Sequence, residues 1–262
     1  MLCCANGMNN YFYAKWNMRK KTALVLSGGG ANGAFQLAAE KFLREERGYK
    51  WDVIAGVSVG ALNGVMLAMH KYEQLEAIWK NVSNDKVYTG KLNGWTLAKL
   101  GVKKLLGMRA KSILGNEPLW KMLDREIELQ DVKVDLKIGA VSLETGEYHN
   151  DFKAQLNLTN AEFKRAVLAS TAIPIIWEPV EISAKLKNMV DGGVRNVSPL
   201  GDVLDENPDE VVIINCNPFA LPALKHPLHD VLDVAKRALD IVMNEIFITD
   251  VREFLRINEM VN

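Results

Sequence analysis

Two strand–turn–helix units follow one another near the start of the chain, and no other feature limits the fold as strongly. The apolar run TALVLS, residues 22–27, ends in the glycine-rich turn GGGANG and continues into a predicted helix over residues 34–46. A second apolar run at residues 53–55 ends in the turn GVSVG and continues into another apolar helix. Short apolar runs of this kind are typical of buried parallel strands. The two units therefore predict an α/β protein whose mainly parallel sheet is covered by helices.

The second turn carries a serine in a pattern associated with nucleophilic catalysis. Gly56-Val57-Ser58-Val59-Gly60 fits G-x-S-x-G, in which a sharp turn lifts a serine hydroxyl between a strand and a helix. Glycines at both ends leave room for a turn that a side chain would block. A tight turn with an incidental serine is the alternative, but the strand before it and the helix after it favour a nucleophile.

A serine hydroxyl needs a neighbouring base to take its proton, and histidine is the usual one. The chain has four histidines, His70, His149, His226 and His229. His70 follows the serine by twelve residues on the same predicted helix, which places it about 18 Å away and excludes it. His149 lies in a predicted hairpin strand. His226 and His229 stand late in the chain, where chain order alone leaves them open as bases.

Asp191 is the better candidate for the base. It follows an apolar approach, and Gly192-Gly193 behind it allows the backbone to turn tightly against another segment. A carboxylate can act as a base when burial raises its pKa toward neutrality. The alternative is an Asx-turn ahead of a loop, which is a common use of Asp-Gly.

The first glycine-rich turn has two interpretations. Gly28 to Gly30 lie between a strand and a helix N-terminus, where free N–H groups favour the oxyanion that ester cleavage creates. Gly28, Gly30 and Gly33 also satisfy the dinucleotide fingerprint G-x-G-x-x-G. In that fold an acidic residue ends the second strand, whereas here the acidic residues at that spacing precede it. No Walker lysine follows the glycines, so a P-loop is excluded.

Composition narrows the class of protein. The 262 residues suit one large domain, and 32 basic residues balance 32 acidic ones, so nothing favours nucleic acid as a partner. Three cysteines (Cys3, Cys4 and Cys216) do not make a disulfide framework, and a reducing compartment fits better. No metal role is expected from them. No apolar run reaches about 18 residues, so we expect a cytoplasmic protein, at most peripheral to a membrane.

The predicted domain covers residues 22–262, preceded by a leader and interrupted by one insertion. Residues 1–21 carry aromatic and basic side chains that would suit a membrane interface, although a mobile leader, or a true start at Met8 or Met18, is favoured. Residues 83–116 are basic and amphipathic, and they are interpreted as a helical lid insertion or as a solvated hairpin.

Other elements follow from hydrophobic periodicity. In the helix over residues 34–46, Phe35, Ala38, Ala39 and Phe42 fall on one side. Thr159 and Glu162 form a predicted capping box. The apolar stripe of the last helix is interpreted as core. The further predicted helices cover residues 73–81, 117–127, 159–174 and 228–257, and the further strands cover residues 134–141, 148–152 and 211–215.

Together these motifs resemble the patatin-like phospholipases. Residues 27–33, the serine turn at residues 56–60 and Asp191-Gly192-Gly193 occur in that family's order, and residues 169–174 look like its stretch upstream of the aspartate. The resemblance spans residues 22 to about 215. It implies a three-layer α/β/α sandwich with a mainly parallel central sheet, and hydrolysis of lipid or phospholipid esters by a Ser–Asp dyad through an acyl-enzyme.

The resemblance also implies a role for each matching residue. Ser58 corresponds to the nucleophile and Asp191 to the general base, with an oxyanion hole formed by Gly28, Gly29, Gly30 and Ala31 and with no metal or cofactor. Asn32 departs from the family, which usually has Arg or Lys there, so a charge-assisted grip on the oxyanion or on a phosphate is not expected. Acyl transfer to another acceptor and a non-catalytic regulatory role on the same scaffold remain the alternatives.

Overall fold

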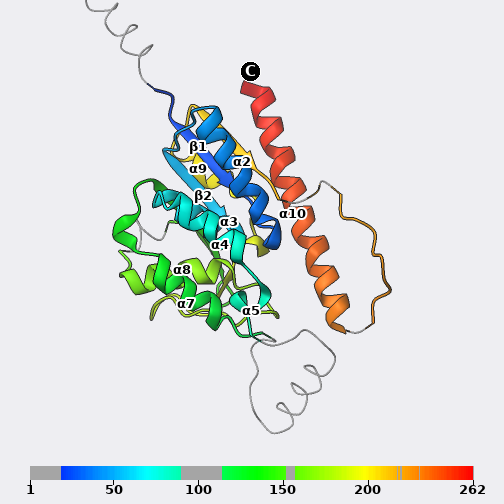
Figure 1. Cartoon of the computed structure of the whole chain (residues 1–262). Coiled ribbons are helices and arrows are strands. Elements are labelled where there is room, and N and C mark those ends of the chain that lie inside the picture. The colour runs from blue at the N-terminus through cyan, green and yellow to red at the C-terminus, as the bar shows by residue number, and fades with distance from the viewer. Residues whose placement is uncertain are drawn as a thin grey trace, which may run out of the picture.

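The computed structural model describes residues 19–89, 114–151, 157–216, 218, 220–229 and 231–261. Among these residues, six strands form a mixed sheet in the order β4-β3-β2-β1-β6, with β5 also paired to β3 (Figure 1). β1, β2, β3 and β6 run parallel, and β4 and β5 run antiparallel to β3. The strands are β1 Thr22–Leu26, β2 Val53–Val57, β3 Asp135–Ser142, β4 Tyr148–His149, β5 Met189–Asp191 and β6 Glu210–Ile214.

Helices cover both faces of this sheet, which gives the predicted α/β/α arrangement (Figure 1). One face carries α2, α3 and α8, with α4 and α7 packed outside α3 and α8, and the other carries α9 and part of α10. Short 3-10 turns at Gly30–Asn32, Leu129–Asp131 and Gly192–Val194 complete the described elements. The helices are α2 Gly33–Glu46, α3 Val59–Ala68, α4 Tyr72–Asn81, α5 Asn84–Val87, α7 Glu117–Glu126, α8 Asn160–Ser170, α9 Gly201–Leu204 and α10 Val231–Val261.

The central strands are buried on both faces, as predicted for parallel strands. In β1, Leu24 and Leu26 belong to the larger core cluster beneath α3 and α8, whereas Ala23 and Val25 belong to a smaller cluster on the opposite face. All four side chains have no exposed surface. This alternation follows from the two-residue period of a strand, and it explains why β1 shows a continuous apolar run.

Strand register brings the glycine turn, the serine turn and the aspartate to one edge of the sheet. Leu26 lies opposite Gly56 in β2, so the turns after β1 and β2 leave the sheet at the same level. Val57, the last residue of β2, lies opposite Gly139 of β3. The next residue of β3, Ala140, pairs with Asp191. β5 therefore takes its place beside β3 where β2 turns away into α3.

The predicted capping box is confirmed. The Thr159 hydroxyl accepts a hydrogen bond from the Glu162 N–H at 3.3 Å, and the Thr159 N–H donates to the Glu162 carboxylate at 2.9 Å. These two bonds form the capping box that begins α8. The strand predicted over residues 148–152 is shorter, because β4 ends at His149, and residues 152–156 lie outside the described part of the chain.

The orientation of α2 differs from that expected of an apolar stripe. Phe35 is 59% exposed and Phe42 is 50% exposed, whereas Gln36 and Glu40 are fully buried. Polar residues face inward because they have partners there. The Gln36 amide donates to the Ser27 carbonyl at 2.7 Å, and Glu40 accepts from the Trp51 indole at 3.0 Å. The side with Phe35 and Phe42 therefore faces outward.

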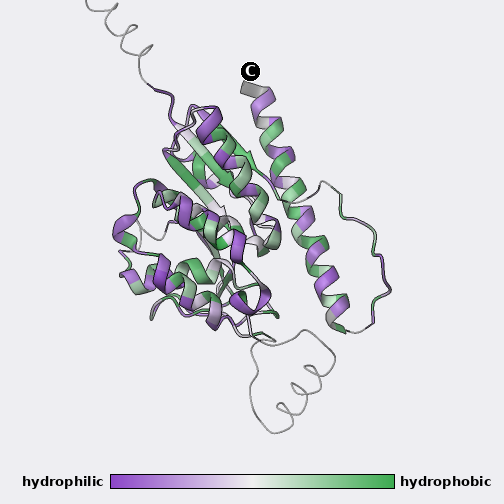
Figure 2. Ribbon diagram, viewed as in Figure 1, coloured by the Kyte–Doolittle hydropathy of each residue, from purple (hydrophilic) through white to green (hydrophobic). Residues whose placement is uncertain are grey.

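The interpretation of the α10 stripe as core is wrong for most of the helix. Phe247 is fully buried, but Val231 is 80% exposed and Val242 is 54% exposed. Figure 2 shows hydrophobic and hydrophilic bands alternating along the coloured part of α10. A helix of 31 residues is about 46 Å long, whereas a five-residue strand spans about 17 Å. Only part of α10 can therefore lie against the sheet.

The predicted leader and the predicted lid insertion are described only in part. Residues 1–18 and 90–113 lie outside the described residues, so the interpretations of the leader and of the lid stay predictions there. Within the predicted leader, the Lys21 N–H donates to Asp209 at 2.8 Å and Arg19 pairs with Asp52, so the folded part includes residue 19. In the part of the chain that the structure describes, no helix has the length and apolar character needed to span a bilayer.

Truncation of an apolar side chain should destabilise the protein on the buried side of α2 but not on the exposed side. Leu37→Ala removes a buried side chain from the main cluster and should lower the free energy of unfolding by about 2–4 kcal/mol. Phe35→Ala, on the exposed side, should change it by less than about 0.5 kcal/mol. Urea unfolding of both variants measures this, and equal losses would contradict the orientation of α2.

Candidate active site

Ser58 lies at a strained turn between β2 and α3. Its backbone has φ 56° and ψ −127°, in the left-handed region that non-glycine residues rarely adopt. The glycines on either side make the turn possible. A Cβ on Gly56 would lie 2.3 Å from the Gly60 carbonyl oxygen, and a Cβ on Gly60 would lie 2.2 Å from the Leu26 carbonyl oxygen. The chain therefore passes so close to itself that only glycine fits at both positions.

The turn is held from behind by α8. The Ser58 N–H donates to the Ser170 hydroxyl at 3.1 Å, while the Ala61 and Leu62 N–H groups donate back to the Ser58 carbonyl. Ser58 is consequently the N-cap of α3, and the positive end of that helix dipole lies beside its side chain. Ser170 is a contact that the sequence did not identify, because the two serines are 112 residues apart.

Asp191 has no exposed surface and lies next to Ser58. Its Oδ1 accepts a hydrogen bond from the Gly193 N–H at 2.8 Å. Burial raises the pKa of the Asp191 carboxyl to about 7, and the interactions with the Ser58 side chain and the Gly193 N–H act in the opposite direction. The structure thus brings together the serine and the aspartate that the sequence singled out, although they are separated by 133 residues.

The second carboxylate oxygen of Asp191 differs from the first in having no hydrogen-bond partner in the described part of the chain. Oδ2 is buried and has no hydrogen bond of normal geometry to any described residue. The contact with the Ser58 side chain is therefore long or poorly aligned. Such contacts are common in ligand-free hydrolases and tighten when substrate binds.

The glycine loop after β1 divides into two functional parts. The Gly28 N–H donates to the Val197 carbonyl at 3.0 Å, so this amide is already engaged, and a Cβ on Gly28 would lie 3.4 Å from the Ser58 Cβ. Gly30, with φ 56°, and Ala31 line the same cavity as Ser58. Of the four residues predicted for the oxyanion hole, Gly30 and Ala31 are thus best placed to face a reacting carbonyl.

Hydrogen bonds of Asn32 and Cys216 hold this loop against the chain that follows β6. The Asn32 side-chain amide donates to the Cys216 carbonyl at 3.1 Å, the Cys216 thiol contacts the Asn32 carbonyl at 3.2 Å, and the Cys216 N–H donates to the Ser27 hydroxyl at 2.9 Å. A Cβ on Gly29 would lie 2.3 Å from the Cys216 Cβ. Burial raises the pKa of the Cys216 thiol to about 11, so it stays neutral. Asn32 therefore supports the loop through hydrogen bonds and not through charge.

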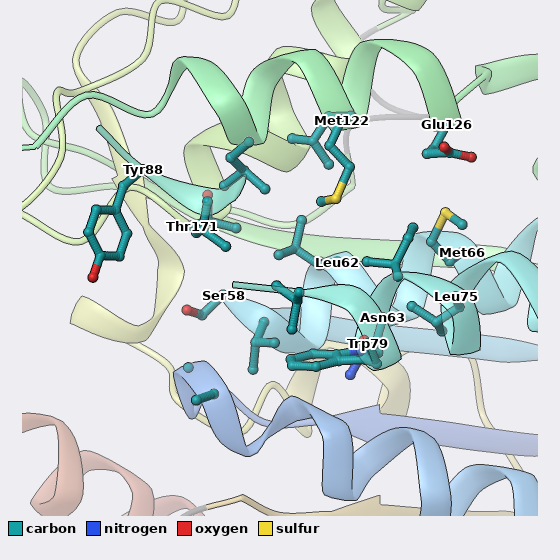
Figure 3. A pocket seen from close by; sticks show the side chains of 18 of the residues that line it. Ser58, Leu62, Asn63, Met66, Leu75, Trp79, Tyr88, Met122, Glu126 and Thr171 are labelled. Atoms are coloured by element: carbon teal, nitrogen blue, oxygen red, sulfur yellow. The ribbon is translucent and has the colours of Figure 1, made fainter. Parts of the chain in front are cut away.

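A cavity of about 470 Å³ opens beside Ser58. Figure 3 shows Ser58 toward one end of it and Glu126 toward the other, with Leu62, Met66 and Met122 between them. The walls come mainly from α3, α4 and α7, and they are apolar. The further apolar residues that line it include Leu75, Ile78, Trp79, Leu119, Leu123, Ile127 and Ile173.

A buried polar network joins the cavity wall to the glycine loop. The Trp79 indole donates to the Asn63 amide oxygen at 2.8 Å, and the Asn63 amide nitrogen donates to the Gly33 carbonyl at 2.9 Å and to Gln36 at 3.0 Å. Gly33 itself allows α2 to approach α3, because a Cβ there would lie 2.3 Å from the Val59 side chain. The signal in the sequence was Asn63, a polar residue inside the apolar run ALNGVML.

None of the four histidines lines the cavity or is among the groups that shift the pKa of Asp191. His70 is exposed and stacks on Tyr72 with ring centroids 5.7 Å apart. His149 lies in β4, across β3 from Asp191, since both residues pair with Ala140. His226 and His229 are exposed. Within the described ranges, no cluster of three or more His, Cys, Asp or Glu side chains could hold a metal ion.

Adding one methyl group at the serine turn should destabilise the fold. Gly56→Ala places a Cβ against the Gly60 backbone and should lower the free energy of unfolding by about 2 kcal/mol or more. Gly201→Ala is the matched control, because a Cβ there meets nothing within 4 Å. Thermal unfolding of both variants checks this, and a Gly56→Ala protein as stable as the control would show that the turn relaxes freely.

Removing the Asp191 charge should stabilise the protein at alkaline pH. The carboxyl binds its proton more tightly when folded, since its pKa rises from 3.8 to about 7. Its contribution to stability is therefore complete below pH 4 and is lost as the pH rises through 7. Asp191→Asn does not titrate, so its stability relative to wild type should increase between about pH 4 and pH 7, by up to about 4 kcal/mol, and level off above pH 7. Parallel pH profiles for the two proteins in urea unfolding would contradict the burial of an ionisable group here.

Two known proteins are similar to this chain over part of its length. The chain is 25% identical over 193 residues to the uncharacterized protein YqhO of Bacillus subtilis (strain 168), in an alignment that covers 67% of this chain and 64% of that protein. It also resembles the crystal structure of VipD from Legionella pneumophila, with a TM-score of 0.44, 15% identity, and coverage of 67% of this chain and 46% of that chain. The chain thus spans less than two thirds of the length of each protein.

The family assignment rests on a match to a family model. The model of the family described as "Patatin-like phospholipase" matches residues 24–204, which is more than half of the chain and includes the glycine loop, Ser58 and Asp191. The chain therefore belongs to the patatin-like phospholipase family.

Proposed function

We propose that this protein is a serine hydrolase that cleaves fatty acyl esters of lipids or phospholipids with Ser58 as nucleophile and Asp191 as general base. Family membership supports lipid acyl hydrolysis in general. The observation that carries the specific mechanism is the Asp191 carboxyl, which is fully buried beside the Ser58 side chain and has a pKa of about 7. A base of this pKa is ionised in about half of the molecules at neutral pH and holds a proton well once it accepts one.

Each step can be assigned to an atom. The Ser58 Oγ forms a bond to the ester carbonyl carbon while its proton passes to the free Oδ2 of Asp191. The carbonyl oxygen becomes an oxyanion, which the backbone N–H groups of the loop around Gly30 and Ala31 would stabilise together with the N-terminus of α3. The carbon–oxygen bond to the alcohol breaks, and the alcohol leaves with the proton from Asp191.

The acyl-enzyme is then hydrolysed by the same two residues, with water as the attacking group. Water attacks the acyl carbon and gives its proton to Asp191, the bond to Ser58 Oγ breaks, and the proton returns to the serine. No cofactor takes part in this proposal. The same intermediate could pass its acyl group to another alcohol, so the ratio of free acid to transferred acyl product separates hydrolysis from acyl transfer.

The cavity supports an acyl chain as the group that is recognised. Its volume of about 470 Å³ falls within the usual range for small-molecule sites, about 300–1,000 Å³. The lining between Leu62 and Met122 is apolar, so a hydrocarbon chain entering from Ser58 would be removed from water along its length. We place the acyl chain there and the alcohol portion of the lipid on the side of Gly30.

Substrate would reach this cavity from a lipid surface. Val82, which lines the cavity, and Ile175, which lies between two lining residues, are both exposed. Exposed apolar side chains beside the opening fit a cytoplasmic protein that touches the membrane at its periphery and does not remain there. The basic lid predicted over residues 83–116 would add contacts to anionic lipids.

Kinetics of single variants test the dyad. Ser58→Ala should abolish ester hydrolysis, and Asp191→Asn should lower kcat at least about a thousandfold, because the amide keeps the shape but cannot accept the proton.

In the wild type, kcat/KM should rise about tenfold per pH unit below pH 7 and level off above it, following the raised pKa of Asp191. Assays with long-chain nitrophenyl esters and phosphatidylcholine vesicles measure both.

The controls separate a dyad from a triad. His149→Gln and His229→Gln should keep most of the activity, and a fluorophosphonate should label the wild type but not Ser58→Ala. A folded histidine variant as inactive as Ser58→Ala would overturn the dyad. Failure of the wild type to react with the fluorophosphonate would instead favour a non-catalytic protein on this scaffold.

A further inference from the structure

One turn of the chain links the two halves of the active site. It follows Asp191 and starts with Gly192, whose carbonyl accepts the N–H groups of Arg195 and Asn196 at 2.9 Å each. It includes Val197, whose carbonyl accepts the Gly28 N–H at 3.0 Å. The segment at residues 192–198, called here the aspartate turn, therefore connects the proposed base to the start of the glycine loop. A shift of this turn would move both.

α10 lies over the aspartate turn. A Cβ on Gly193 would lie 2.8 Å from the Met243 methyl group, so Met243 rests directly on the turn. Phe247, one helical turn later, is fully buried. Phe254 packs against the smaller core cluster on the same face of the sheet. Met243, Phe247 and Phe254 thus mark the side of α10 that packs against the rest of the domain.

Asp250 is the polar member of this contact. Burial raises the pKa of the Asp250 carboxyl to about 6; its interactions with the backbone N–H groups of Ser198 and Val197 act in the opposite direction, and the neighbouring Asp202 adds to the rise. With the Asn196 amide turned to satisfy its partners, its nitrogen donates to Asp250 Oδ2 at 3.3 Å and to the Ser198 carbonyl at 3.0 Å. One carboxylate therefore engages three consecutive residues of the aspartate turn.

We infer that Asp250 is a positioning residue for the proposed reaction, holding the aspartate turn so that Asp191 stays beside Ser58 and the Val197 carbonyl orients Gly28. The inference rests on the proposed function but adds an element to it. α10 lies outside residues 24–204, the part of the chain that matches the family. This chain therefore uses a helix beyond the matched region to support residues within it.

The position of α10 predicts which kinetic constant should change. No described residue of α10 lines the cavity, so the contacts proposed for the acyl chain do not involve this helix. Loss of Asp250 should leave those contacts in place and loosen the geometry of the reacting groups. Misplacement of catalytic groups by about 1 Å costs on the order of 10²-fold in rate. The effect should therefore appear in kcat and not in KM.

The experiment compares Asp250→Ala and Asp250→Asn with Asp240→Ala, an exposed aspartate on the same helix. Asp250→Ala should lower kcat on a nitrophenyl ester about 30- to 100-fold and change KM less than about twofold. Asp250→Asn keeps one acceptor oxygen and should lose less. Asp240→Ala should match the wild type. Amide hydrogen exchange of the peptide covering residues 192–199 should accelerate in Asp250→Ala and stay unchanged in Asp240→Ala.

Each outcome decides the inference. Unchanged exchange in a folded Asp250→Ala protein would show that the carboxylate does not hold the turn. Faster exchange with an unchanged kcat would show that the turn need not be held for catalysis. If Asp250→Ala fails to fold, Asp250→Asn carries the comparison, and equal kcat values for Asp250→Asn and Asp240→Ala would then overturn the inference. A wild type that cleaves no ester refutes the proposed function, and hydrogen exchange alone then decides whether Asp250 holds the turn.

Discussion

The removal of one carboxyl group from water is the constraint on which this site depends. Asp191 has no exposed surface, and a carboxylate in such surroundings is unfavourable unless it can share its charge or hold a proton. The Gly193 N–H satisfies one oxygen, and the other has no hydrogen-bond partner among the described residues. Burial therefore has two effects. It raises the pKa of the Asp191 carboxyl toward neutrality, and it leaves only one of the two carboxylate oxygens without a hydrogen-bond partner in the described structure. Catalysis of the proposed kind needs both.

Close packing of backbone against backbone creates that burial. A Cβ on Gly192 would lie 2.5 Å from the Gly139 carbonyl oxygen, and a Cβ on Gly139 would lie 2.2 Å from the Tyr148 hydroxyl. β3 is thus covered on one side by the aspartate turn and on the other by Tyr148, which donates to Asp202 at 2.7 Å. Glycine at these positions removes the volume that would otherwise separate Asp191 from the serine turn. The geometry of the site therefore depends on these glycines, which lack side chains, as well as on the side chains that are present.

Much of this arrangement could be predicted from the sequence, because it depends on local features. The runs ending in Gly28 and Gly56 show their strands, and Asp191 is identified by the glycines that follow it. The structure places both turns at one edge of the sheet because β1 and β2 run parallel, and Asp191 reaches that edge through the antiparallel pairing of β5 with β3. What could not be predicted depends on distant partners. The burial of Gln36 and Asn63 reflects carbonyl groups that only the folded chain presents.

The same reason explains the two helices whose orientation was mistaken. Hydrophobic periodicity shows that a helix has an apolar side but not which neighbour covers it. α2 turns its phenylalanines outward because its polar side finds hydrogen-bond partners inside, and α10 extends past the sheet because it is longer than the strands. The engagement of the Gly28 amide with Val197 was likewise invisible, since it joins segments that lie far apart in the chain.

The cavity wall contains its own optical reporter. Trp79 lines the cavity, and its indole N–H is committed to Asn63, so its position is fixed by a bond that does not involve a ligand. Indole emission responds to the polarity of the medium around the ring. A hydrocarbon chain that displaces water from this cavity would therefore shift the emission of Trp79 to shorter wavelength, and the occupancy of the cavity could be followed in the unlabelled protein against a variant that lacks this tryptophan.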